Sequence, residues 1–210
     1  MRFINVTTVA EGTPLAPFDG WLLSDVVVEN HHEALCQSFP DRGFAILDVR
    51  PSSPASEYLG GSLEVLPLVS PAAEFADPWK GMIAEIQSAD YDRAIEGLVG
   101  QSLQQTTKRL RLMRYTRGAY LDTHFDNQRN KILTQIFYFN RSWNQEWGGC
   151  LELLLGPPAS NPNVLKVLPV ISNSPIIQST EKAFHRVSRI CAENAPTRNT
   201  MLVEWFRNGS

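Results

Sequence analysis

The chain has 210 residues, of which 43% are hydrophobic and 20% charged, and its formal net charge at pH 7 is −3. This length and composition are typical of a soluble globular protein with one hydrophobic core. The slight negative charge argues against a nucleic-acid partner, or an anionic membrane, held by general electrostatics.

The N-terminus lacks the apolar segment of a signal peptide, and no apolar run approaches the roughly 18 residues that span a bilayer. The cysteines, Cys36, Cys150 and Cys191, are scattered and indicate neither a disulfide framework nor a zinc site. We therefore expect a cytoplasmic protein with no membrane partner. The sequence does not indicate an oligomeric state.

The N-terminal part is predicted to contain one helix and one strand. Residues 1–20, rich in Thr, Pro and Gly, suggest an edge strand or a loose lead-in. Residues 24–39 are predicted to form a helix, with Ser24 as its N-cap and Pro40 as its stop. Residues 43–49 are predicted to form a short apolar strand.

Residues 50–78 are rich in proline and lack a clear period, which predicts a long irregular region with one strand near 63–69. Pro78 then opens a stretch with apolar residues at helical spacing. The stretch predicts two helices, or one kinked helix, that end near residues 97–100 and pack against a sheet.

From residue 108 onwards the pattern changes to short strands separated by turns. They are expected near 108–116, 119–125, 132–139, 150–155, 164–170, 175–179, 184–190 and 198–206. Short strands after a helical N-terminal part predict a mainly β protein, a double-stranded β-helix (jelly roll) flanked by helices. We expect one domain over residues 1–210, with helical support at roughly 24–100 and the jelly-roll core at roughly 108–206.

His124 and Asp126 stand two residues apart in a strand-like segment. Side chains at this spacing share one face of an extended backbone, so they can hold two positions of one metal ion. His185 offers a third ligand, and two His with one carboxylate form the facial triad of non-haem Fe(II) oxygenases. His-x-Asp alone is a weak signal, and a surface loop is the alternative.

With its neighbours, this pair resembles the prolyl-4-hydroxylase-like group of the 2-oxoglutarate/Fe(II)-dependent oxygenases, over roughly residues 108–206. The resemblance rests on the order and spacing of Tyr115 with Gly118, His124-x-Asp126, Lys131-x-Leu133-Thr134, Phe137–Asn140, Gly148-Gly149-x-Leu151, His185-x-Val187 and Arg198-x-Thr200. It implies Fe(II) bound by His124, Asp126 and His185, 2-oxoglutarate, and dioxygen as co-substrate. The carboxylate at Asp126 implies hydroxylation or another oxidation, because related halogenases carry a small residue there.

The resemblance also implies an anchor for the far carboxylate of 2-oxoglutarate. Arg198, 13 residues after His185, suits a planar carboxylate because its guanidinium can bind in two places. Thr200 and Tyr138 are expected to assist it. Arg189 is the competing anchor, and a surface salt bridge is the alternative role for Arg198.

The substrate pocket is less clearly marked. Tyr115 resembles a tyrosine that lines the oxoglutarate or substrate pocket, although packing at an edge is nearly as well supported. Arg111 and Met113 share its strand face and are expected to look into the same pocket. Asn127 and Arg129 lie in the turn after the metal pair, and they are further candidates for the substrate pocket.

The activity implied is oxidation of an unactivated C–H bond, coupled to decarboxylation of 2-oxoglutarate to succinate. We expect a small molecule as substrate, an amino-acid derivative or a natural-product intermediate, because no peptide-binding domain is evident. A prolyl or other protein side-chain hydroxylase is the alternative. A non-catalytic jelly-roll binding module and an iron dioxygenase without oxoglutarate also stay open; the intact triad argues against the first, and Arg198 with Thr200 against the second.

Overall fold

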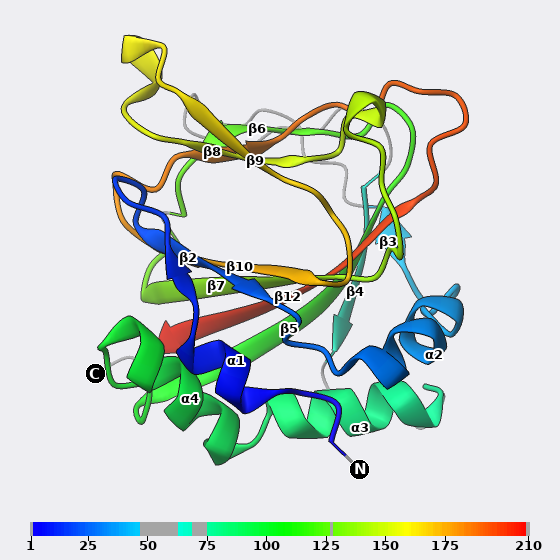
Figure 1. The fold of residues 1–210 in the computed structure, drawn as a ribbon, viewed down its shortest axis with the longest axis vertical. Coiled ribbons are helices and arrows are strands. Elements are labelled where there is room, and N and C mark those ends of the chain that lie inside the picture. Colours follow the sequence, from blue (N-terminus) through cyan, green and yellow to red (C-terminus); the bar gives the residue numbers. More distant parts are fainter. Residues whose placement is uncertain (1, 47–62, 69–74, 127, 209–210) are drawn as a thin grey trace.

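The computed structural model describes residues 2–46, 63–68, 75–126 and 128–208 (Figure 1). Within these ranges the strands form two antiparallel sheets that lie one above the other (Figure 1). The larger sheet has the strand order β1-β2-β10-β7-β12-β5-β4-β3, and the smaller sheet has the order β6-β11-β8-β9. Two such sheets with helices on one side form the jelly roll that the sequence predicted.

The strands are β1 (Thr13–Pro14), β2 (Gly20–Ser24), β3 (Ala45–Ile46), β4 (Leu63–Leu68), β5 (Thr106–Tyr115), β6 (Leu121–His124), β7 (Lys131–Tyr138), β8 (Leu151–Leu154), β9 (Val164–Val167), β10 (Asn173–Gln178), β11 (His185–Val187) and β12 (Arg198–Arg207). The α-helices are α1 (Val6–Ala10), α2 (His32–Gln37), α3 (Asp77–Ile86) and α4 (Ala89–Val99), and the 3-10 turns are η1 (Glu29–His31), η2 (Gln145–Trp147) and η3 (Pro158–Ser160). Every strand predicted after residue 108 is confirmed, as β5 to β12.

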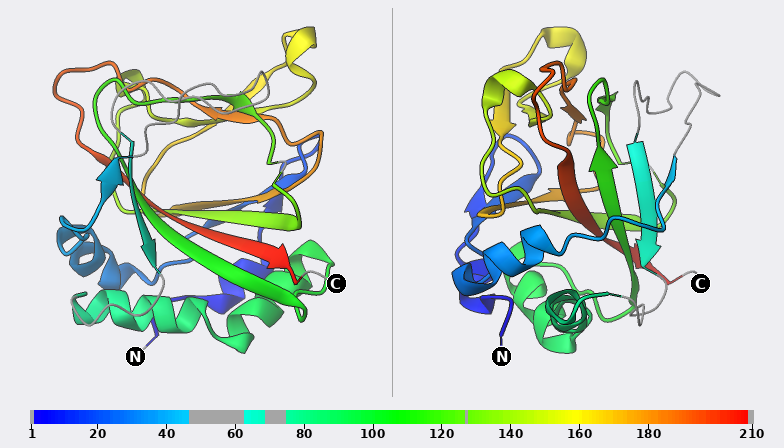
Figure 2. Two further views of the ribbon diagram at one scale, coloured as in Figure 1. Left: turned by 180° about the vertical axis from the view of Figure 1, so that it is seen from behind. Right: turned by 90° about the vertical axis from the view of Figure 1, so that its right-hand side faces the viewer.

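Helices α3 and α4 lie beneath the outer face of the larger sheet, as Figure 2 shows from two further sides. They are the two helices that the sequence predicted, and Ser88 separates them by capping α4, its hydroxyl accepting the backbone N–H of Tyr91 at 3.2 Å. Trp79 and Ile95 bury their side chains with Trp205 of β12 in one hydrophobic cluster. Every helix in the described ranges is too short or too polar to cross a lipid bilayer.

Strand β12 turns polar side chains into the space between the sheets. Its residues Met201 and Val203 pack toward the helices, whereas Arg198, Thr200 and Glu204 alternate with them and face the other way. All three polar residues are buried. Polar groups in an interior are costly unless each has a partner, so this inward face indicates a functional site and not ordinary core packing.

The predicted helix over residues 24–39 is wrong in its first part. Ser24 ends β2 and caps no helix, Asp25 has a positive φ of 54°, and only the six residues of α2 are α-helical. The cause is backbone pairing: Val26 accepts from the N–H of Asn5, and Val28 donates to Phe3, each within 2.9 Å. This β-branched segment thus pairs with the N-terminal chain. An edge strand or a loose lead-in was expected over residues 1–20; the edge strand is present as β1, and α1 was not predicted.

The irregular region is described only in part. The strand predicted near residues 63–69 is confirmed as β4, which pairs with β5 along its whole length. The strand predicted over 43–49 is seen as β3, and its last residues fall outside the described ranges. Most of the region from 50 to 74 also falls outside them.

A turn that contains Gly148 leads into β8 of the smaller sheet. Gly148 has φ 76° and ψ −156°, and a Cβ atom placed on it would lie 1.8 Å from the carbonyl oxygen of Arg189. We expect Gly148→Ala to lower the free energy of unfolding by about 3 kcal/mol, through strain and displacement of that backbone. Urea denaturation measures the change.

The matched control is Gly97→Ala in α4, where nothing lies within 4 Å of the added methyl group. It should leave stability unchanged or raise it by about 1 kcal/mol, since alanine favours the helix. Equal changes in the free energy of unfolding for the two substitutions would contradict the conclusion that the turn at Gly148 requires glycine.

Candidate metal centre

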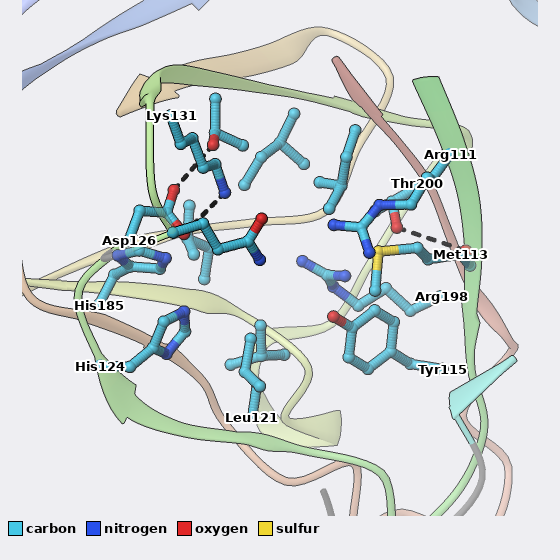
Figure 3. Close-up of a pocket in the computed structure, with 16 residues that line it drawn as sticks. Arg111, Met113, Tyr115, Leu121, His124, Asp126, Lys131, His185, Arg198 and Thr200 are labelled. Carbon is cyan, nitrogen blue, oxygen red and sulfur yellow. Dashed lines mark hydrogen bonds and ion pairs between the residues drawn. The ribbon is translucent and has the colours of Figure 1, made fainter. Parts of the chain in front are cut away.

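The structure brings His124, Asp126 and His185 together. His124 is the last residue of β6 and His185 the first of β11, and the two are direct partners in the antiparallel pairing of these strands. Their ring centroids are 4.2 Å apart, and one ligand atom from each of the three residues lies within 4.8 Å of the others. This triad occupies one side of a pocket (Figure 3). The pairing of β6 with β11 therefore brings His185 beside His124 although they are far apart in the sequence, and the three groups are placed to hold one metal ion.

Both histidines present the same ring nitrogen to the pocket. Nδ1 of His124 lies 2.7 Å from the carbonyl oxygen of Asp122, and Nδ1 of His185 lies 2.9 Å from that of Ala183. Because a carbonyl oxygen only accepts, each Nδ1 donates, and each Nε2 keeps its lone pair for a metal. Burial, together with the neighbouring His124, lowers the pKa of His185 to about 4, so this imidazole is neutral at pH 7.

The carboxylate of Asp126 is held at both oxygens. Nζ of Lys131 lies 2.8 Å from one oxygen, and the hydroxyl of Thr134 donates to the other at 2.7 Å. Burial alone would raise the pKa of Asp126, but the charge and the hydrogen bonds of these two partners hold it well below its usual range. The group is therefore ionised, and each oxygen keeps a further lone pair for a metal.

A cluster of charges around the buried Glu204, which the sequence did not reveal, supports that carboxylate. Glu204 is fully buried and takes hydrogen bonds from Arg109 at 2.9 Å and Arg111 at 3.0 Å, with Nζ of Lys131 at 2.9 Å. These cations overcome burial and lower the pKa of Glu204. Lys131 therefore links Glu204 to Asp126. The available signal was Glu204 within the run Met201–Phe206, whose other members are apolar, and Lys131 at the start of a strand-like segment.

Arg198, the predicted anchor for the far carboxylate of 2-oxoglutarate, lies at the buried end of the pocket. Arg198 is 2% exposed, and its guanidinium carbon lies 4.6 Å from the ring centroid of Tyr115 and 5.1 Å from that of Tyr138. Nε of Arg198 and the hydroxyl of Tyr138 have no hydrogen-bond partner within the described part of the chain. Burial raises the pKa of Tyr138, so its hydroxyl stays protonated. Two neighbouring buried donors of this kind fit a carboxylate.

The remaining predicted residues divide into two groups. Arg111 and Met113 line the pocket, and so does Thr200, although its hydroxyl donates to the carbonyl oxygen of Met113 at 3.3 Å. Arg189 is exposed, stacks over a ring on the surface and donates to Gly118, so it is not the anchor.

The turn after the metal pair is only partly described. Arg129 is exposed and does not line the pocket, whereas its neighbour Gln128 does. Asn127 lies outside the described residues.

The pocket is thus lined by the triad, by two cations of the charge cluster and by the buried Arg198. Its lining residues are Arg111, Met113, Tyr115, Leu121, His124, Asp126, Gln128, Lys131, Thr134, Ile136, Leu151, His185, Val187, Arg198, Thr200 and Leu202.

Comparison with known proteins agrees with this arrangement. Residues 110–207 match the sequence model of the 2OG-Fe(II) oxygenase superfamily. Sequence comparison with curated proteins finds no significant match.

The fold is similar to that of a prolyl-4-hydroxylase from Pseudomonas putida, with 17% identity, a TM-score of 0.68, and coverage of 97% of this chain and 99% of that one. It is also similar to a prolyl hydroxylase from Trichoplax adhaerens in complex with a hypoxia inducible factor peptide, with 18% identity, a TM-score of 0.63, and coverage of 96% and 89%. A third similar structure is HygX from Streptomyces hygroscopicus with nickel and 2-oxoglutarate bound, with 10% identity, a TM-score of 0.59, and coverage of 91% and 84%.

A jelly roll with two His and one carboxylate at the edge of an interior pocket defines the class of non-haem iron oxygenases. Within that class, residues 110–207 match the model of the 2OG-Fe(II) oxygenase superfamily. The protein is a 2-oxoglutarate-dependent dioxygenase, with Fe(II) and 2-oxoglutarate as its cofactors.

Proposed function

We propose that His124, Asp126 and His185 bind the Fe(II), and that Arg198 and Tyr138 bind the far carboxylate of 2-oxoglutarate. One observation carries the second assignment: the two buried donors without partners share one pocket with the triad. Tyr115 stacks on the Arg198 guanidinium and fixes its orientation, and Thr200 completes the wall at this end.

Each residue then has a defined task. The two Nε2 atoms and one oxygen of Asp126 would hold the metal ion at the side of the pocket where the triad lies. Lys131 and Thr134 fix the carboxylate in position, which holds it in one orientation. With both cofactors bound, dioxygen supplies the power to oxidise an unactivated C–H bond while 2-oxoglutarate is converted to succinate.

For the substrate, we propose a small molecule, such as an amino-acid derivative or a natural-product intermediate. The cations Arg111 and Lys131 line the pocket beside the triad. Charged groups of an amino-acid derivative suit such a wall, whereas a proline within a peptide carries no charge. The second candidate, hydroxylation of a prolyl residue in a protein, is favoured by the fold similarity to the two prolyl hydroxylases.

The test is an anaerobic titration of the metal-free protein with Fe(II) and 2-oxoglutarate, followed by the weak visible charge-transfer band of their chelate. We expect a band that needs both components and is lost in Arg198→Ala. Iron binding without the band would favour a dioxygenase independent of oxoglutarate. Absence of iron binding would remove the triad from the metal site.

A further inference from the structure

The pocket is polar at its solvent end as well as at its buried end. Side-chain exposure falls from 42% at Arg109 to 21% at Arg111 and 4% at Lys131, while Arg198 is 2% exposed as a whole residue. Gln128, also exposed, accepts a hydrogen bond from Arg109 at 2.9 Å. A molecule that enters from solvent therefore meets Arg111 before it reaches the Arg198 end.

Arg111 keeps hydrogen-bond donors available at this position. Its Nε and one terminal nitrogen, Nη2, each donate to Glu204 at 3.0 Å, in a two-pronged contact. A guanidinium has five N–H donors, so the edge formed by its two terminal nitrogens still carries donors beyond those that Glu204 uses. Figure 3 shows the Arg111 side chain directed into the pocket, across from His124 and Asp126. Glu204 thus fixes the guanidinium with its remaining edge toward the pocket.

The charges around the pocket do not balance once the cofactors are included. Among the residues that the structure describes, the cations Arg109, Arg111, Lys131 and Arg198 outnumber the anions Asp126 and Glu204. The two charges of Fe(II) and the two of 2-oxoglutarate cancel, so a positive charge remains in the interior. A charge in an interior of low dielectric is costly without a partner, and a negatively charged group on the substrate supplies one.

We propose that the substrate is a small molecule with a free carboxylate, and that Arg111 binds this carboxylate while Glu204 positions the guanidinium. The proposal rests on the proposed function and narrows its substrate class. A prolyl residue inside a peptide chain has no free carboxylate, so the assignment also separates the two substrate candidates.

The experiment measures binding to the Fe(II)- and 2-oxoglutarate-loaded protein under anaerobic conditions by calorimetric titration. The probes are the common amino acids and their N-acetyl derivatives, each as the free acid and as the primary amide, with a set of phosphate monoesters beside them. At least one acid should bind at least about tenfold more tightly than its amide, since a charge-assisted hydrogen bond is lost in the amide. In Arg111→Gln this acid should bind no better than the amide.

The matched control is Arg109→Gln, which also removes an arginine from Glu204 but replaces a residue that does not itself line the pocket. Its preference for the acid should stay within about threefold of that of the unaltered protein. An equal loss in both variants would show a general effect of the charge cluster and would overturn the role of Arg111.

Three other outcomes would contradict the proposal or the function on which it rests. Binding of amides or phosphate esters in preference to acids, or of no acid at all, would overturn the carboxylate assignment. Loss of the charge-transfer band in Arg111→Gln would mean that Arg111 holds 2-oxoglutarate and not the substrate. A missing band in the unaltered protein would instead contradict the proposed function itself, so the two failures are distinguishable.

Discussion

Asp126→Ala is expected to abolish the Fe(II)/2-oxoglutarate charge-transfer band and to lower turnover by at least about a thousandfold. The substitution removes one of three proposed metal ligands, and metal-assisted stabilisation of a reaction is worth several kcal/mol, at 1.36 kcal/mol for each factor of ten in rate. The fold should persist because Lys131, which loses its partner at Asp126, keeps Glu204 at 2.9 Å. Iron binding, the band and urea denaturation are measured on the same preparation.

Asp122→Ala is the matched control. This aspartate lies on β6, two residues before His124, its side chain is exposed, and its backbone carbonyl oxygen accepts a hydrogen bond from His124. Its replacement should leave iron binding and the band unchanged. Full turnover in Asp126→Ala would remove this residue from the metal site, and a collapse of stability in that variant would show that the carboxylate is needed for folding.

The proposed triad could be assembled before the structure because it depends on local geometry. The i, i+2 spacing of His124 and Asp126 survives in any extended segment, and the strand-like run around His185 is short enough to identify. The eight strands of the barrel followed from the same period-two pattern. These features need no knowledge of which strand lies beside which.

The charge cluster, by contrast, could not be predicted, because it depends on which strands lie side by side in the sheet. Glu204 meets Arg109 through the pairing of β12 with β5, and it meets Lys131 because β7 lies on the other side of β12. The strand order of the sheet decides these contacts, and it is not written in any single strand. The same holds for the N-terminal segment, where Val26 to Val28 fit a helix and a strand equally well until Phe3 and Asn5 supply backbone partners.

The choice between the two candidate anchors depended on where a strand ends. By alternation, Arg189 would share the inward face of His185 and Val187, but β11 stops at Val187. Beyond that point the chain turns outward, and Arg189 stacks on Tyr120 at the surface. Sequence spacing alone cannot locate the end of so short a strand.

Arg198→Lys is expected to raise the 2-oxoglutarate concentration needed for half-maximal turnover by about a hundredfold. The lysine keeps the charge but lacks the planar two-pronged donor, and charge-assisted hydrogen bonds are worth about 1.5–3 kcal/mol each. The rate at saturating 2-oxoglutarate should change much less, because the substituted group does not touch the metal. Steady-state kinetics with varied 2-oxoglutarate separates the two effects.

Arg189→Lys makes the same chemical change at the exposed arginine and should leave the oxoglutarate response unaltered. Tyr138→Phe supplies the decisive cross-check, because it removes the second buried donor without changing charge. If Arg198 and Tyr138 hold one carboxylate, their combined substitution should cost less than the sum of the single effects. Fully additive effects would mean that they bind different groups. An unchanged response in Arg198→Lys would transfer the anchor to Arg111, the other arginine that lines the described pocket.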